Sequence, residues 1–304
     1  MSSLGRFLRT ARERLAFKSW YTDGFQNAVH SALLSLNWPV KHAAIIAEER
    51  YLQEAMRAAP YTDPLRLERF GRKLYSQFDE DGIIAEIFRR VGVTGRTFVE
   101  FGVEDGTECN TLALLLQGWR GLWLEGRVEH VDWIERHFQQ ERERGLLTVK
   151  HAFITAENIN ALVGAWSEGE IDLLSIDIDG NDIHVFEAMT AVRPRVVVIE
   201  YDAKFPPPIA VAPKYDATRV WRGTAYMGAS LEAIVRVARR RGYLLVGCNF
   251  VGLNAFFVRD DLVGDRFQAP FTAENHYQPA RYFLWELYHA NHPRDWGPYV
   301  EILG

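Results

Sequence analysis

The fold is decided by the stretch Phe98-Val99-Glu100-Phe101-Gly102-Val103-Glu104-Asp105-Gly106. It begins as a short apolar run of the buried-strand type and passes into a turn that contains two glycines. Glycines at these places allow a sharp turn and a close approach of the backbone to a ligand, as after the first strand of nucleotide-binding folds. Asn110, Leu112 and Leu115 then follow at helical spacing. The stretch predicts a strand, a ligand-binding turn and a helix in succession.

Further short apolar runs of the same type follow along the chain. They are Gly121 to Glu125, Thr148 to Phe153, Ile171 to Ile178, Val196 to Tyr201, Tyr243 to Cys248 and Ala255 to Arg259. Most are separated by enough residues for a crossover helix, which predicts a parallel sheet covered on both faces. Only Asn249 to Asn254 separates the last two, which suits a hairpin. We therefore predict an α/β fold, a Rossmann-like doubly wound sheet of seven strands with a terminal antiparallel hairpin.

The chain divides into three predicted parts: a helical extension over 1–70, the sheet domain over 71–265 and an aromatic-rich tail or lid over 266–304. Leu4 to Lys18 has the spacing of a basic amphipathic helix, and Arg281 to Ala290 is a second predicted helix. The first would lie on an anionic membrane surface, on its own protein or on a twin subunit. A homodimer through the N-terminal helices is thus one prediction.

The net charge and the cysteine content indicate which partners and which cellular compartment to expect. The 304 residues carry a formal net charge of -5, which argues against binding nucleic acid by bulk positive charge. Cys109 and Cys248 are the two cysteines, without zinc-site spacing, so we expect a reducing, cytoplasmic environment. No apolar run reaches the ~20 residues of a membrane span, and the N-terminus has no secretion-signal pattern.

The charge of the turn indicates its ligand. Glu100, Glu104 and Asp105 would repel a pyrophosphate and favour a positively charged group. Glu125 lies 19 positions after Gly106, at the end of the second predicted strand. An acidic residue at this place suits hydrogen bonding to ribose hydroxyls. Together these features predict a cationic nucleoside as ligand.

Four segments, in their order and spacing, resemble a known family. They are Tyr75-Ser76-Gln77 with Glu80-Asp81-Gly82, Glu100 to Thr111, Ser175 to Asp182, and Gly228-Ala229-Ser230-Leu231 before the final hairpin. They resemble class I S-adenosylmethionine-dependent methyltransferases and, within these, the FkbM-like O-methyltransferases. The resemblance covers about Tyr75 to Leu262, and it implies a seven-stranded sheet whose last strand is inserted antiparallel.

The resemblance also implies a cofactor site for S-adenosylmethionine. Glu100, Gly102 and Gly106 would shape the sulfonium and amino-acid pocket, Glu125 would bind the ribose, and adenine would lie near Ala152 and Phe153. The full set of implied cofactor residues is Gln77, Glu100, Gly102, Asp105, Gly106, Asn110, Glu125, Ala152, Phe153 and Asp177. One residue departs from the pattern, because Glu104 stands where many members have a second glycine.

The ends of the fourth and fifth predicted strands carry the densest group of acidic residues, and two chemical interpretations remain open. In one, Asp177 and Asp179 with Glu200 or Asp202 hold a divalent cation such as Mg²⁺, which acidifies a substrate hydroxyl. In the other, Asp177 faces the ligand's amino group and Asp179 or His184 accepts the substrate proton.

Structural explanations stand beside both interpretations. Asp179-Gly180-Asn181-Asp182 has the composition of a turn and helix cap, and His184 has the place of a helix-surface histidine.

The sequence thus predicts an enzyme, an S-adenosylmethionine-dependent O-methyltransferase that acts on a hydroxyl of a small molecule, such as a sugar or a natural product. The unmatched N-terminal helices and the segment from Phe205 to Tyr226 would select the acceptor. Two alternatives are a nicotinamide-dependent oxidoreductase, which the acidic turn disfavours, and a non-catalytic Rossmann-like assembly protein.

Overall fold

The computed structural model describes residues 42–282 and 297–304. The chain forms two compact units, 1–54 and 55–304. Residues 42–54 of the first unit are helical. The helix predicted over Leu4 to Lys18 lies outside the described residues, and so does the helix predicted over Arg281 to Ala290 except for its first two residues, which are not helical. The three-part division of the chain stays a prediction.

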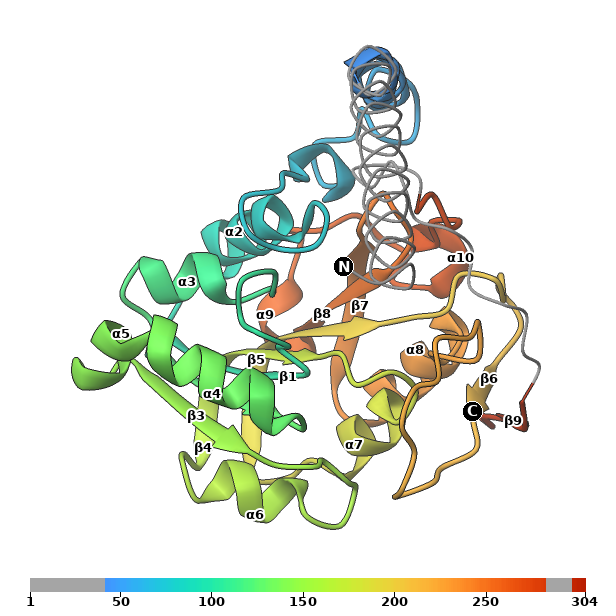
Figure 1. The fold of residues 1–304 in the computed structure, drawn as a ribbon. Coiled ribbons are helices and arrows are strands. Elements are labelled where there is room, and N and C mark those ends of the chain that lie inside the picture. Colours follow the sequence, from blue (N-terminus) through green and yellow to red (C-terminus); the bar gives the residue numbers. More distant parts are fainter. Residues whose placement is uncertain (1–41, 283–296) are drawn as a thin grey trace, which may run out of the picture. The chain divides into compact units, whose positions relative to one another are not determined.

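The second unit is built on a seven-stranded sheet (Figure 1). Its strands are β1 (Thr97–Phe101), β2 (Arg120–Glu125), β3 (Leu147–His151), β4 (Gly169–Ile176), β5 (Val192–Glu200), β7 (Tyr243–Cys248) and β8 (Asn254–Arg259), in the order β3-β2-β1-β4-β5-β8-β7. β1 to β5 are parallel, and β8 is antiparallel to both of its neighbours. The predicted fold, including the inserted antiparallel strand, is confirmed.

Helices cover the sheet on two faces because successive side chains of a strand point to opposite sides. One face carries α2 (Glu80–Val91), α3 (Leu112–Leu116), α4 (Val128–His137) and α5 (Gln139–Glu143), and the other α6 (Ile159–Gly164), α7 (Asp182–Ala188) and α8 (Leu231–Arg240). Phe98 of β1 packs with α2 and α3, whereas Val99 packs with α6 to α8. The side of the sheet on which a β1 residue lies therefore decides its surroundings.

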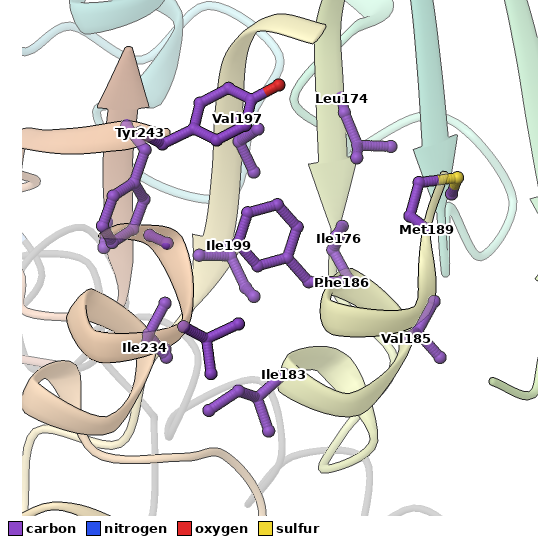
Figure 2. Packing of buried hydrophobic residues seen from close by; sticks show 14 of the residues in the cluster. Leu174, Ile176, Ile183, Val185, Phe186, Met189, Val197, Ile199, Ile234 and Tyr243 are labelled. Atoms are coloured by element: carbon purple, nitrogen blue, oxygen red, sulfur yellow. The ribbon is translucent and has the colours of Figure 1, made fainter. Parts of the chain in front are cut away.

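The core on the α6–α8 side is a continuous apolar cluster. Figure 2 shows Phe186 of α7 with Ile176 of β4, Ile199 of β5 and Ile234 of α8. Burying such side chains contributes about 1.5–3 kcal/mol each. This packing fixes the ends of β4 and β5, where the acidic residues begin.

The remaining elements are short. They are η1 (Glu68–Phe70), α9 (Asp260–Val263), α10 (Ala273–His276), β6 (Val211–Pro213) and β9 (Tyr299–Glu301). β6 and β9 pair antiparallel, so the C-terminal residues are tied to the segment after β5, a pairing that the sequence did not predict. Within 42–282 and 297–304, none of the helices has the length and hydrophobicity that a membrane span requires.

Candidate functional site

A cavity of about 550 Å³ lies at the carboxyl ends of the parallel strands, where ligands bind in folds of this kind. It brings together residues that are far apart in the sequence. Of the predicted cofactor, metal and catalytic residues, those that line it are Gln77, Gly102, Glu125, Ala152, Phe153, Asp177, Asp179 and Glu200. The site is therefore assembled by sheet topology from the tips of β1 to β5.

The turn after β1 needs glycine for steric reasons. Gly102 has a φ of 70°, and a Cβ there would lie 1.7 Å from the carbonyl oxygen of Asp177. Gly106 has a φ of 77°, and its Cβ would lie 2.6 Å from the Trp123 ring. Both values of φ fall in the left-handed region that favours glycine. Gly102 thus allows the turn after β1 to approach the end of β4 at the cavity, and Gly106 allows the same turn to pack against Trp123 of β2.

Glu125 ends β2 with its carboxylate at the cavity wall. Its Oε2 accepts a hydrogen bond from the Glu104 amide at 2.9 Å, and its Oε1 accepts one from the Arg127 amide at 2.8 Å. The side chain is largely buried. Because a carboxylate has about four acceptor positions, both oxygens can still accept hydroxyl hydrogens. The arrangement fits the ribose-binding role that the resemblance implies.

Gln77 reaches the cavity on a loop that Asp81 holds in place. Oδ2 of Asp81 accepts hydrogen bonds from the amides of Leu74, Tyr75 and Ser76 at 2.8, 2.7 and 2.8 Å, and from Ser76 Oγ at 2.9 Å. The buried carboxylate satisfies these backbone donors. The hydrogen bonds of Asp81 thus hold the loop before Gln77 and position Gln77 at the cavity, which gives a structural reason for the Ser76-Gln77 and Asp81-Gly82 pattern.

Asp177, Asp179 and Glu200 form an acidic trio at the ends of β4 and β5. Each offers a carboxylate oxygen, and these oxygens lie within 4.8 Å of one another. Oε2 of Glu200 is buried and has no hydrogen-bond partner among the described residues. Like charges at this separation repel strongly unless a cation or a proton lies between them. The geometry thus favours a positively charged occupant.

The electrostatics of the trio agree with its geometry. Burial, followed by the charges of neighbouring carboxylates, raises the pKa of Asp177 and of Glu200 well above the usual range. Burial together with the charges of Asp182 and Glu104 raises the pKa of Asp179 to about 7, and Arg219 opposes this shift. A carboxyl group with a pKa near neutrality can accept or donate a proton at physiological pH.

Asp202, the other acidic residue considered for the metal, is differently placed. Its Oδ2 lies 2.6 Å from Lys204 Nζ, and this ion pair supplies a counter-charge within the chain. Glu200 is therefore the residue of β5 that completes the trio.

Glu100 requires a correction, because the structure places it outside the cavity. In the register of the sheet it lies between Trp123 and Ser175, on the side that α2 and α3 cover. Its Oε1 accepts hydrogen bonds from the Asn110 amide at 2.9 Å and from Ser175 Oγ at 3.1 Å. Its Oε2 accepts hydrogen bonds from the amide, at 3.0 Å, and the hydroxyl of Thr111. Glu100 shapes the turn before α3 and does not line the cavity.

Three further predicted residues also do not line the cavity. Asp105 Oδ1 accepts a hydrogen bond from the Thr107 amide at 3.0 Å, within its own turn. Asn110 is buried and donates from Nδ2 to Ser175 Oγ at 3.1 Å. Gly106 packs against Trp123. These residues shape the loop beside the cavity, and their part in cofactor binding stays a prediction.

His184 is also placed away from the cavity. It lies on α7, where its Nε2 is 2.7 Å from the carbonyl oxygen of Pro213 and its ring packs edge-on against Tyr215. A general base must come within hydrogen-bond reach of the proton that it removes. The prediction of His184 as a candidate base is therefore corrected. Its side chain packs α7 against Pro213 and Tyr215 of the segment after β5.

The sequence missed many lining residues, and four of them lie on the long segment after β5. Arg219, Val220, Trp221 and Met227 belong to this segment, and Leu253 and Tyr282 come from other parts of the chain. The segment is attached to the acidic turn: Arg219 Nε donates to the Asp179 carbonyl at 3.1 Å, and Asn181 Nδ2 donates to the Asp216 carbonyl at 2.8 Å. The length of the segment was the available signal, but it does not identify which side chains face inward.

Comparisons with known proteins found likeness in structure only. No protein-family model and no curated protein sequence matches the chain. Among solved structures, the N-terminal domain of EvdMO1 with SAH bound superposes with a TM-score of 0.40 and 15% identity, over 68% of this chain and 94% of that one.

Two other solved structures are similar to the same degree. The O-methyltransferase from Bacillus cereus in complex with SAH gives a TM-score of 0.39 and 15% identity, over 71% of this chain and 89% of that one. A TehB-like SAM-dependent methyltransferase from Corynebacterium glutamicum gives 0.35 and 15%, over 70% and 98%. Likenesses at these values assign neither a family nor an activity to this chain.

Proposed function

We propose that this protein is an S-adenosylmethionine-dependent methyltransferase that methylates a hydroxyl oxygen of a small molecule. The observation that carries the proposal is the joining, in one cavity, of Gly102, Glu125, Phe153 and the acidic trio. This order of groups matches the successive parts of the cofactor: amino acid and sulfonium near the trio, ribose at Glu125 and adenine at Ala152 and Phe153. The FkbM-like relationship and the sugar or natural-product acceptor belong to the same proposal.

The chemistry asked of the protein is alignment and removal of one proton. The acceptor oxygen forms a bond to the methyl carbon as the carbon–sulfur bond breaks, and the hydroxyl proton leaves the acceptor. Asp179 is the base that we propose, because it lines the cavity and its pKa is raised to about 7. Asp177 would face the amino group of the cofactor.

Binding of adenosyl compounds tests the proposal. Glu125→Ala should weaken binding of S-adenosylmethionine by at least about tenfold, the value of one lost charge-assisted contact. Isothermal titration calorimetry measures this, with Glu187→Ala as a control because Glu187 is an exposed partner of Arg240 on α7. Glu125→Gln keeps an acceptor for only one of the two backbone amides, so the Tm of both Glu125 variants is measured as well, and an unchanged Tm separates ligand loss from loop damage. A folded wild-type protein that binds no adenosyl compound would contradict the proposal and favour an assembly role.

A divalent cation is a second candidate occupant of the trio, favoured by the unpartnered, buried Oε2 of Glu200. Three carboxylate oxygens form a donor set that suits Mg²⁺. The ion would be held by Asp177, Asp179 and Glu200, and when bound it would acidify the acceptor hydroxyl.

Thermal unfolding separates the two candidates. If the trio holds Mg²⁺, adding it to chelator-treated protein should raise the Tm, because a ligand that binds only the folded state stabilises it. The variant Glu200→Gln should lose most of this increase. An unchanged Tm in the wild type, with turnover that resists the chelator, would eliminate the metal and leave Asp179 as the base.

A further inference from the structure

Three residues other than glycine have a φ in the left-handed region among the described residues: Arg96, Glu104 and Asp179. Left-handed backbone crowds the Cβ of such residues and is unfavourable by about 1–2 kcal/mol. Arg96 does not line the cavity, whereas Glu104 and Asp179 both do. Strained backbone that persists at a ligand cavity is a reason to look for a function of the side chain.

Glu104 stands in a turn where the backbone would accept glycine. Its φ is 50°, and the two flanking left-handed positions of the same turn, 102 and 106, are glycines. Its amide donates to Glu125 Oε2 at 2.9 Å, a bond that a glycine would make equally well. Neither the fold nor this hydrogen bond therefore requires a glutamate side chain.

The charge of Glu104 also lies at a cavity lined by other acidic groups. Glu104 lines the same cavity as Asp177, Asp179 and Glu200, and like charges around one cavity repel each other. No salt bridge joins the Glu104 carboxylate to a basic side chain within the described part of the chain. A side chain that adds both strain and repulsion gains stability when a cation binds between it and Asp179.

We propose that Glu104 binds the positively charged methionine part of the cofactor and so selects ligands by charge. This inference rests on the proposed function and adds a residue to its site. In the proposed function the uncharged adenosine part would lie at Glu125, Ala152 and Phe153, so its binding should not depend on the Glu104 charge.

Adenosyl compounds with and without the charged methionine groups test the proposal. Glu104→Gln should weaken binding of S-adenosylmethionine by about tenfold, which corresponds to ~1.4 kcal/mol. Binding of 5′-methylthioadenosine, which lacks both the sulfonium and the amino acid, should change less than about twofold, within the error of such a comparison. S-adenosylhomocysteine, which keeps the ammonium, locates the contact: an equal loss places it at the amino group and a smaller loss at the sulfonium.

Arg96→Gly is the matched control, because it relieves the same kind of backbone strain outside the cavity. Glu104→Gly and Arg96→Gly should both leave the Tm unchanged or higher, since glycine adopts this φ freely. Only Glu104→Gly should weaken S-adenosylmethionine binding. If both Glu104 variants bind it as tightly as the wild type, or lose methylthioadenosine equally, the inference is wrong. If the wild type binds none of the three compounds, the proposed function itself fails.

Discussion

Glu100 and Glu200 form a natural comparison within the molecule. Both are glutamates near the carboxyl ends of parallel strands, and both side chains belong to residues that are 3% exposed. Glu100 accepts four hydrogen bonds, from backbone amides and hydroxyls, whereas Oε2 of Glu200 has no partner among the described residues. Burial raises the pKa of both; hydrogen bonds from Thr111 and Asn110 oppose the shift at Glu100, whereas the charges of neighbouring carboxylates such as Asp177 add to it at Glu200.

The difference separates a structural carboxylate from a binding one. A buried charge is tolerated when donors within the chain satisfy it, and it then stabilises the segment that supplies them. A buried carboxylate without donors, beside other carboxylates, is unfavourable unless a proton or a cationic ligand neutralises it. Glu100 thus stabilises the turn before α3. Glu200 is the carboxylate that we expect to bind a cation from outside the chain.

The largest expected effect comes from the same substitution at the two positions. Glu100→Gln places an amide NH₂ against donors, so it should reduce the free energy of unfolding by about 2–4 kcal/mol. Glu200→Gln removes repulsion within the trio, so it should leave that free energy unchanged or raise it by about 1 kcal/mol. Urea denaturation followed by circular dichroism measures both. Equal destabilisation by the two variants would show that Glu200 also has hydrogen-bond donors in the folded chain, and it would contradict the distinction between the two glutamates.

A smaller effect is expected in the pH dependence of stability. The Asp179 pKa rises from 3.8 to about 7 on folding, so the folded state binds its proton more tightly than the unfolded state does. The contribution of Asp179 to the free energy of unfolding is fully present below pH 3.8, its pKa in the unfolded chain. It is lost as the pH rises towards about 7, by at most about 1.4 kcal/mol per pH unit. Tm measured between these pH values should fall less steeply in Asp179→Asn. A wild-type profile as flat as that of the variant would contradict the raised pKa.

Much of the cavity could be predicted because the rule that places it is topological. Glu125, Asp177, Asp179 and Glu200 all follow from one statement, that parallel strands of one sheet end at the same edge. The spacing of apolar runs was enough to find those ends. The length of the link between β7 and β8 likewise predicted the antiparallel pair, since so few residues cannot form a crossover.

Glu100 and His184 were misplaced because the direction of a side chain depends on its neighbours. Glu100 is one residue before the end of β1, and alternation sends it to the α3 side instead of the cavity. His184 is close to the acidic turn in sequence, but the rotation of α7 directs it to Pro213. Arg219 and Trp221 were missed because nothing periodic marks which residues of a long segment face inward.

The sequence by itself determined the order of strands and helices, the glycine turn and the chemical character of the strand ends, because apolar periodicity, steric freedom and charge are properties of neighbouring residues. Only the tertiary structure decided which carboxylates accept hydrogen bonds from the protein and which have an oxygen without a donor, because such donors can come from residues distant in the chain. Glu100 accepts a hydrogen bond from Ser175 of the neighbouring strand β4, whereas Glu200 lies beside the carboxylates of Asp177 and Asp179. The free energy of a buried charge depends on these partners, so the function of each glutamate was settled by the fold.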